Sequence, residues 1–234
     1  MRIAVLGDVH GNAFALEAVL ADLRACAPDL TLNLGDTVWG AADPARAWAL
    51  QLEHAPPTVR GNTDELVAGW HPDRFPEWQA WVTEQLPPDL PGTLGALPTT
   101  AQRAGGELLL AHGAPHTTWD ALFAGPDGRS ASPAELEARV QDFPAARVVL
   151  IGHTHQEQLR SVHGLTFVNV GAVSRQLQGD PAARWTLLER RAGQWNVTFR
   201  RVPYNVEAAA AWAAAHCPMG AQEAEHLRTG RPPG

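Results

Sequence analysis

Short apolar segments of this chain end repeatedly at a glycine that stands beside an aspartate or a histidine. Residues 2–6 run into Gly7-Asp8, and residues 30–34 run into Gly35-Asp36. Segments 107–111 and 147–151 end in the same way, at HG and GHTH. Segments this short and this apolar predict buried strands. Helical periodicity separates the first strands, so the sequence predicts an α/β layered fold.

The chain is expected to form a single domain over residues 1–234, with a small insertion. At about 150 residues per domain, 234 residues make one domain with an extension. In about 65–103, Trp70, Trp78 and Trp81 alternate with prolines, which predicts a cap-like insertion. These tryptophans would form the core of the cap or stack on a nucleobase. A β-hairpin is expected at 185–202, a helix at 206–216 and a disordered tail at 228–234.

Composition excludes several classes of partner. The formal charge is -7 and all 18 basic residues are arginine, which argues against extended nucleic-acid binding. Cys26 and Cys217 are too few for a disulfide framework and favour a reducing cytoplasm. The sequence has neither a secretory signal nor an apolar run of about twenty residues, so we expect a cytoplasmic protein without membrane contact. The oligomeric state stays open.

Metal-ligand residues recur at the carboxyl ends of the predicted strands. They are Asp8, His10, Asp36, Asn62, His112, His153 and His155. Loops at the carboxyl ends of parallel strands converge on one crevice. Each residue alone is more often a turn residue or a hydrogen-bonded core histidine. The ordered set instead predicts a site for two divalent ions about 3.5–4 Å apart.

The motifs at these positions resemble those of the calcineurin-like metallophosphoesterases. In order, they are residues 7–12 (GDVHGN), 35–36 (GD), 61–64 (GNTD), 112–113 (HG) and 152–155 (GHTH). Residues 169–173 (NVGAV) with 179–181 (GDP) resemble the closing loop of small bacterial members. The resemblance implies a four-layer α/β/β/α sandwich of two mixed sheets, which the Trp/Pro-rich insertion would cap.

The resemblance also implies a role for each ligand. The first ion would be held by Asp8, His10 and His155. The second ion would be held by Asn62, His112 and His153. Asp36 would bridge both ions, and this mixture of oxygen and nitrogen donors suits manganese, iron or zinc. Asp36 and Asn62 would thereby serve catalysis, in which a metal-bridging hydroxide attacks phosphorus directly.

One position departs from the family pattern. Most members carry a histidine after the asparagine of GNTD, where this chain has Thr63. A threonine hydroxyl is no acid near neutral pH, so a general-acid contribution of about 10²–10⁴-fold is lost. The bacterial phosphodiesterase branch often lacks this histidine too. Because leaving groups of low pKa need little protonation, we favour a phosphodiesterase over a monoesterase. His116 is either the replacement acid or a surface loop residue.

Four further residues are candidates for substrate contact. Asn12, Arg60 and Arg175 would reach a phosphate oxygen, although Asn12 also suits a helix cap and Arg60 can point away. Trp39 would line the pocket. Asp64 is expected to orient its loop through hydrogen bonds. Residues 35–40 contain no arginine, which argues against a protein phosphatase.

The sequence therefore predicts a binuclear-metal phosphoesterase that acts on a small phosphorylated substrate, either a phosphodiester or a nucleotide-like molecule. A phosphomonoesterase of broad specificity and a DNA-processing nuclease are the alternative enzymes. A non-catalytic scaffold of the same fold is the alternative from another class. All seven ligand residues are present, which weighs against the scaffold.

Overall fold

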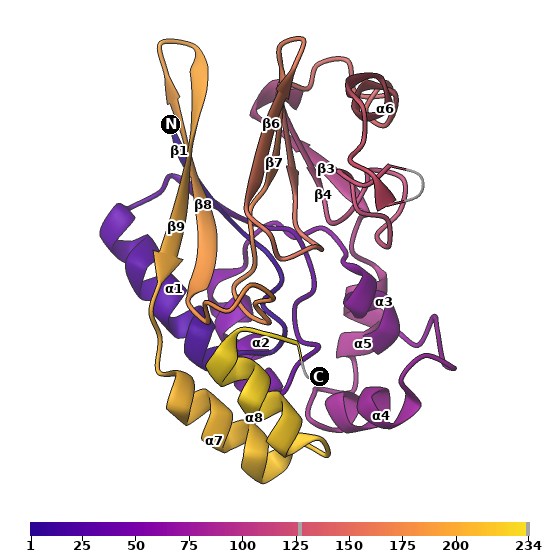
Figure 1. The fold of residues 1–234 in the computed structure, drawn as a ribbon, viewed down its shortest axis with the longest axis vertical. Coiled ribbons are helices and arrows are strands. Elements are labelled where there is room, and N and C mark those ends of the chain that lie inside the picture. The colour runs from indigo at the N-terminus through magenta and orange to yellow at the C-terminus, as the bar shows by residue number, and fades with distance from the viewer. Residues whose placement is uncertain (126–127, 233–234) are drawn as a thin grey trace.

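The computed structural model describes residues 1–125 and 128–232, and two mixed sheets form its centre (Figure 1). The first sheet has four strands in the order β2-β1-β8-β9. Their bounds are β1 (Arg2–Leu6), β2 (Leu30–Asn33), β8 (Ala183–Arg191) and β9 (Gln194–Val202). β1 pairs in parallel with β2 and antiparallel with β8, and β8 and β9 form the expected hairpin.

The second sheet has five strands in the order β3-β4-β5-β7-β6. Their bounds are β3 (Thr100–Arg103), β4 (Leu108–Ala111), β5 (Val148–Ile151), β6 (Gln158–Val162) and β7 (Leu165–Asn169). The central strands β4, β5 and β7 are parallel, and the edge strands β3 and β6 pair antiparallel with them. The carboxyl ends of the parallel strands therefore share one edge.

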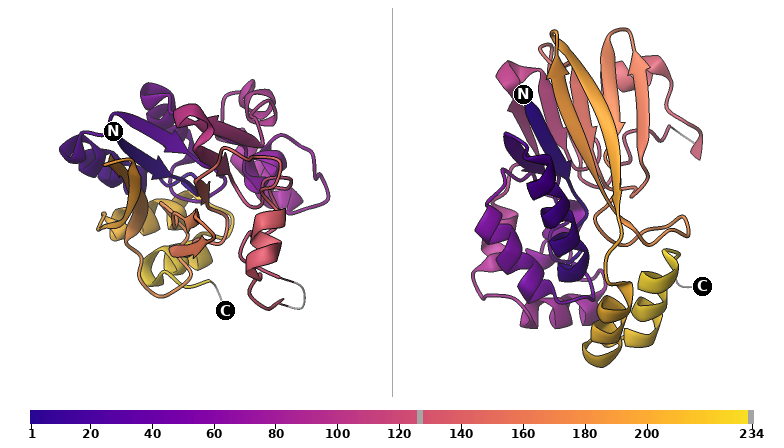
Figure 2. Two further views of the ribbon diagram at one scale, coloured as in Figure 1. Left: turned by 90° about the horizontal axis from the view of Figure 1, so that it is seen from above. Right: turned by 90° about the vertical axis from the view of Figure 1, so that its left-hand side faces the viewer.

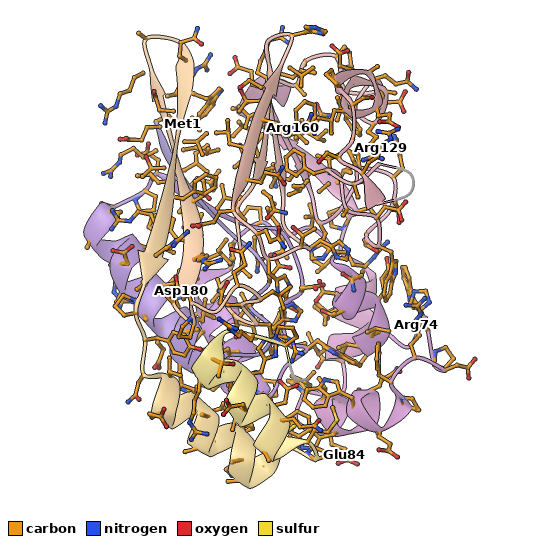
Figure 3. All side chains as sticks on the ribbon, viewed as in Figure 1. Met1, Arg74, Glu84, Arg129, Arg160 and Asp180 are labelled. Carbon is orange, nitrogen blue, oxygen red and sulfur yellow. The ribbon has the colours of Figure 1, made fainter. Side chains whose placement is uncertain are left out.

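The two sheets pack face to face, with helices on their outer faces (Figure 2). Ile3 and Leu150 belong to one buried cluster between the sheets, which side chains of both fill (Figure 3). Helix α1 (Ala13–Cys26) buries Leu16 and Val19 against the first sheet. Helix α6 (Pro133–Ala138) covers the second sheet through Leu136. The predicted four-layer α/β/β/α sandwich of mixed sheets is confirmed.

Further helices gather at the carboxyl edge of the sheets (Figure 1). They are α2 (Pro44–His54), α3 (Asn62–Val67), α4 (Pro76–Glu84), α5 (Leu90–Gly95), α7 (Val206–His216) and α8 (Gly220–Thr229). A short 3-10 turn, Ala104–Gly106, joins β3 to the amino end of β4. None of the helices in the described part of the chain is long and apolar enough to cross a membrane.

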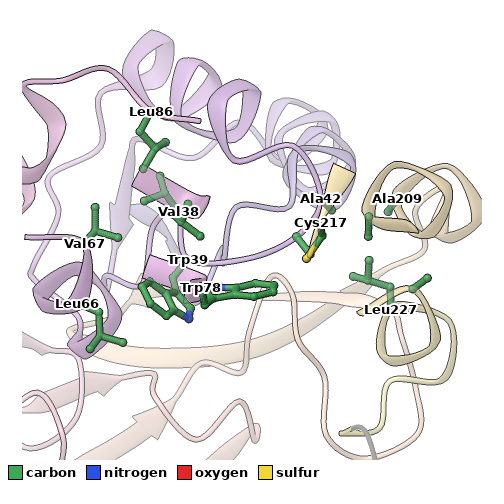
Figure 4. Close-up of a cluster of buried hydrophobic side chains, with 14 of the residues drawn as sticks. Val38, Trp39, Ala42, Leu66, Val67, Trp78, Leu86, Ala209, Cys217 and Leu227 are labelled. Carbon is green, nitrogen blue, oxygen red and sulfur yellow. The ribbon is translucent and has the colours of Figure 1, made fainter. Parts of the chain in front are cut away.

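An aromatic cluster joins the insertion to the last two helices. Trp39 and Trp78 lie beside each other in a buried cluster that also contains Ala209 and Leu227 (Figure 4). Trp81 packs at its edge and donates its indole N–H to the carbonyl of His216. For Trp78 and Trp81, these contacts support a packed core over a base-stacking platform, whereas Trp70 is 50% exposed.

Two boundaries in the structure differ from the expected ones. The insertion was placed at about 65–103, but residues 100–103 form β3, an edge strand of the second sheet. The disordered tail was placed at 228–234, but α8 continues to Thr229, and Arg228 there forms an ion pair with Glu207 of α7. Residues 233–234 of that predicted tail lie outside the described residues. Pairing with β4 sets the first boundary and contacts with α7 set the second, and a local sequence pattern reports neither.

The core between the sheets gives a first test. Leu150 is fully buried there, so Leu150→Ala should lower the free energy of unfolding by about 2–5 kcal/mol. Leu159 of β6 is 45% exposed and is the matched control. Leu159→Ala should change stability by no more than about 0.5 kcal/mol. Urea unfolding measures both variants, and equal losses would contradict this placement of the core.

Candidate metal centre

The loops that follow β1, β2, β4 and β5 are joined by backbone hydrogen bonds. The amides of Asp8 and His10 donate to the carbonyls of Gly35 and Asp36, at 3.0 and 2.9 Å. The amide of Gly152 donates to the carbonyl of His112 at 2.8 Å, which links the loops of the second sheet. These bonds bring polar side chains from distant parts of the sequence to one edge of the sandwich.

The first group of donor atoms comes from Asp8, His10 and His155. Nε2 of His10 lies 3.0 Å from Nε2 of His155. Nε2 of His155 lies 3.5 Å from Oδ1 of Asp8. All three donor atoms fall within 4.8 Å of one another, and all three residues are buried. Ligands held at about 2.0–2.2 Å from one ion have similar mutual distances, so this group can hold a metal ion.

A second group of donor atoms lies beside the first. Oδ1 of Asn62 is 2.9 Å from Nε2 of His112 and 2.9 Å from Nδ1 of His153. Oδ2 of Asp36 is 3.5 Å from Nε2 of His112, and also 3.5 Å from Nε2 of His10 in the first group. Asp36 thus lies at equal distances from the two groups, as a shared ligand should.

The histidine tautomers test whether a cation fits. Nδ1 of His10, His112 and His155 donates to the backbone carbonyls of Trp39, Leu34 and Arg175, respectively, at 2.9, 2.8 and 2.6 Å. A neutral imidazole then carries a lone pair on Nε2. Two lone pairs at 3.0 Å repel each other unless a proton or a cation lies between them. The donor set therefore fits divalent ions, and the three carbonyls orient the rings for them.

Backbone strain is concentrated at these ligands. Asp8, His10, Asp36, His153 and His155 all adopt positive φ angles, between 46° and 69°. This left-handed region is uncommon for non-glycine residues. Such strain persists where the surrounding structure imposes it, and it accumulates at functional sites. The loops are thus folded for the position of their side chains rather than for local backbone preference.

Two glycines let the chain pass close to the aspartates. A Cβ atom on Gly152 would collide with Oδ2 of Asp8, and one on Gly61 would collide with Oδ1 of Asp36. Any larger residue at either position would push a carboxylate out of its place. Gly61 and Gly152 are therefore required for steric reasons, because a side chain there would displace a carboxylate.

Asp64 fastens two of the ligand loops together. Its Oδ2 accepts the amides of Asp36 and Gly61 at 3.0 and 2.8 Å. Its Oδ1 accepts both the amide and the hydroxyl of Thr37, at 3.0 and 2.7 Å. Burial and the charge of Asp36 raise the pKa of Asp64 to about 6, whereas its four donors favour the anion. The expectation that Asp64 orients its loop agrees with these contacts.

The ionisable ligands perturb one another strongly. Burial and the charge of Asp8 raise the pKa of Asp36 to about 7. Burial lowers the pKa of His155, but the Asp8 carboxylate, the Arg175 carbonyl and the charge of Asp36 together raise that pKa above the ordinary value. Burial and neighbouring histidines lower the pKa values of His10 and His153. Without an ion, Asp36 and His155 therefore bind protons more readily than the free side chains do.

Asn12 and Trp39 are occupied by structural contacts. The Asn12 side chain accepts the amide of Ala15, which caps α1, and donates to the hydroxyl of Ser174 at 2.9 Å. Trp39 is buried, and its carbonyl orients His10. The capping interpretation of Asn12 agrees with its contacts, and a role of Trp39 in lining the pocket stays a prediction.

Arg60 and His116 do not point into the cluster. The Arg60 guanidinium donates to the carbonyls of Gly95 and Leu97 in the insertion and lies over the ring of Trp70. The His116 side chain is 58% exposed and contacts Asp142 and Phe143 on the outer face of the second sheet. We therefore retain neither Arg60 as a substrate ligand nor His116 as the replacement acid.

Sequence reasoning missed the groups that orient the histidines. Three of them are backbone carbonyls, which no residue type marks. It also missed the environment of Arg175, whose guanidinium Nη1 donates to Glu223 of α8 at 2.7 Å. Glu223 follows Arg175 by 48 positions and stands in a helix that the sequence pattern did not predict, so no local signal indicated the pair.

The contacts of Asp64 predict that even a conservative substitution there makes the folded protein less stable. Asp64→Asn should lower the free energy of unfolding by about 1–3 kcal/mol, because an amide NH₂ would face donors in place of an acceptor. Chemical denaturation of the metal-free protein measures the loss. Asp73→Asn, at an exposed position of the insertion, is the matched control and should be neutral. Unchanged stability in Asp64→Asn would contradict the role of Asp64 in fastening the two ligand loops together.

Metal binding should depend on pH with a definite sign. The protons on Asp36 and His155 must leave when an ion binds, so metal affinity should fall as pH decreases from about 8 to about 6. Titration calorimetry in two buffers of different ionisation enthalpy should show proton release. Proton uptake, or an affinity that rises at low pH, would contradict these pKa directions.

Comparison with known proteins agrees with this geometry. Residues 1–191 match the family model described as the calcineurin-like phosphoesterase superfamily domain. A metallophosphoesterase structure from Sphaerobacter thermophilus shares 27% identity and a TM-score of 0.75, over 98% of this chain and 100% of that one. The hypothetical protein PH1004 from Pyrococcus horikoshii OT3 shares 18% identity and a TM-score of 0.79, over 99% of both chains.

A structure described as a novel archaeal phosphodiesterase shares 14% identity and a TM-score of 0.51, over 86% of this chain and 100% of that one. Comparison with curated proteins gives no match. The family match covers most of the chain, including the loops that carry all seven predicted ligand residues. This chain therefore belongs to the calcineurin-like phosphoesterase superfamily.

Proposed function

We propose that this chain is a binuclear metal-dependent phosphodiesterase that hydrolyses a small phosphodiester or nucleotide-like substrate. The observation that carries the proposal is the pair of donor groups that share Asp36. Their oxygen and nitrogen donors suit manganese, iron or zinc. When bound, two such ions supply a hydroxide nucleophile from water near neutral pH and neutralise phosphoryl oxygens.

The residues of this chain hold the donors ready for that chemistry. The amide of Thr63 donates to Oδ1 of Asp36 at 2.9 Å, which leaves Oδ2 facing both donor groups. The amide of His153 donates to the Asp8 carboxylate at 3.1 Å. Because the carboxylates of Asp8 and Asp36 are almost fully buried, bulk water does not screen the charges inside the site.

The charge of the site favours a diester. Among the proposed ligands, Asp8 and Asp36 contribute two negative charges, so two divalent ions would leave this ligand set with an excess of two positive charges. One attacking hydroxide and one phosphodiester monoanion neutralise that excess. A phosphomonoester dianion would leave the buried site with a net negative charge, which is costly at low dielectric.

Thr63 also favours a diester substrate. It stands where most relatives carry a histidine, and its hydroxyl is no general acid at neutral pH. Substrates with leaving groups of low pKa suffer least from that loss. The fold likeness to the archaeal phosphodiesterase is consistent with the proposal, although at 14% identity it concerns the fold alone.

The alternatives make different use of the same fold. A phosphomonoesterase of broad specificity requires an acid for alkyl leaving groups. A DNA-processing nuclease requires several phosphate contacts and therefore a steep dependence of activity on salt, whereas we propose a small substrate and a weak dependence. A non-catalytic scaffold needs no intact ligand set.

With free Cys26 and Cys217, we place the enzyme in the cytoplasm, without membrane or extended nucleic-acid partners.

Activity on model substrates tests the proposal. The protein reconstituted with manganese, iron or zinc should hydrolyse bis-p-nitrophenyl phosphate with a higher kcat/KM than p-nitrophenyl phosphate. Asp36→Asn should lower kcat/KM by about 10²-fold or more, because even the groups that orient metal ligands contribute about 10–100-fold. A nucleotide panel then narrows the substrate class.

The control is Asp89→Asn, at an exposed position of the insertion, which should keep full activity. Absence of hydrolysis with all three metals would show that the chain is not such an enzyme. Full activity in Asp36→Asn would show that the hydrolytic site lies elsewhere.

A further inference from the structure

Arg175 stands in a loop that is fixed from two sides. The loop follows β7, and the amide of Ser174 donates to the carbonyl of Asp8 at 3.0 Å. The Arg175 carbonyl accepts Nδ1 of His155 at 2.6 Å, and φ of Arg175 is 56°. The next carbonyl, that of Gln176, accepts Nε2 of His226 of α8 at 2.9 Å. The backbone of Arg175 thus has a defined place between the metal ligands and the last helix.

The Arg175 guanidinium is held by one carboxylate and keeps other donors available. Nη1 donates to Oε2 of Glu223, whose side chain is only 6% exposed. Within residues 1–125 and 128–232, Nε and Nη2 of Arg175 have no hydrogen-bond partner, and its side chain is 25% exposed. An arginine offers five N–H donors in a rigid fork. Those that Glu223 does not use are accessible to a ligand.

The backbone at Arg175 is joined directly to the metal-ligand cluster. Its carbonyl accepts Nδ1 of His155, and the amide of the preceding residue donates to the carbonyl of Asp8. By contrast, the Arg60 guanidinium is already occupied by the carbonyls of Gly95 and Leu97 and by Glu65. Arg175 is therefore the better placed of the two arginines to meet an anion at the metal centre.

We propose that Arg175, held in place by Glu223 of helix α8, donates a hydrogen bond to a non-bridging phosphoryl oxygen of the substrate. This inference rests on the proposed function and assigns it a substrate-binding residue and a positioning residue. Guanidinium groups suit phosphate oxygens through their geometry and fixed charge. The family match ends at residue 191, so helix α8, which holds Arg175, lies outside the matched range.

The buried carboxylate explains how the arginine keeps its place. A long arginine side chain at the surface samples many rotamers, and ordering it costs conformational entropy. The ion pair with Glu223 restricts these rotamers before the substrate binds, which lowers the entropic cost of binding. The pair is neutral as a whole and leaves the charge balance for a diester monoanion unchanged.

The test uses the metal-loaded full chain with bis-p-nitrophenyl phosphate as substrate and inorganic phosphate as a ligand in calorimetry. Arg175→Ala should raise KM and the dissociation constant for phosphate together, by about 10- to 100-fold, with metal content unchanged. Glu223→Ala should raise both by a smaller factor, and Glu223→Gln, which keeps an acceptor, should restore part of the loss. The double variant should resemble Arg175→Ala, because the two residues act as one unit.

Two further arms separate binding from a structural effect. Glu207→Ala breaks the exposed ion pair between α7 and α8 and should leave KM and phosphate affinity unchanged. Added guanidinium at non-denaturing concentration should partly restore Arg175→Ala, which a merely misfolded site would not allow. Phosphate calorimetry tests Arg175 even if the wild type hydrolyses no substrate. Wild-type KM and phosphate affinity in Arg175→Ala would overturn the inference while the proposed function stands.

Discussion

The mutual repulsion of buried donor atoms is the constraint on which the rest of the structure depends. Nε2 of His10 and Nε2 of His155 face each other at 3.0 Å, and the carboxylate of Asp36 stands beside them. Such an arrangement is unfavourable unless a positive charge joins it. The chain holds it nevertheless, through three carbonyls that fix the rings and through Asp64, which fixes the loops. The fold thus holds the donor atoms in an arrangement that is unfavourable by itself and that bound cations would stabilise.

The strained backbone of the metal-binding loops is attached to strands that are well packed in the core. Five of the ligand residues have positive φ angles, yet each stands directly beyond a strand that is buried in the core between or beside the sheets. The core contributes stability through apolar area, and the loops can therefore adopt conformations that serve the site. The C-terminal helices add to this support, because α8 contacts the loop that carries Arg175.

Much of the architecture could be predicted from the sequence, because strands and their terminal glycines are local signals. The strands that precede Asp8, Asp36, His112 and His153 are short apolar runs, and the structure brings all seven predicted ligand residues to one edge. β6, by contrast, is a partly exposed edge strand whose place depends on pairing with β7, and no strong apolar run marks it. α8 depends on tertiary contacts from Glu223 and His226, which local propensity does not reveal. His116 follows the predicted ligand His112 by four positions, but its side chain packs against Phe143, away from the metal centre. Spacing in the sequence does not fix the direction of a loop side chain.

The proposal that two cations share Asp36 can be tested with crystals of the manganese-loaded protein, measured with anomalous scattering. Two anomalous peaks should appear about 3.5–4 Å apart, with Asp36 between them and one donor group on each outer side. A single peak, or ions bound away from Asp36, would contradict it.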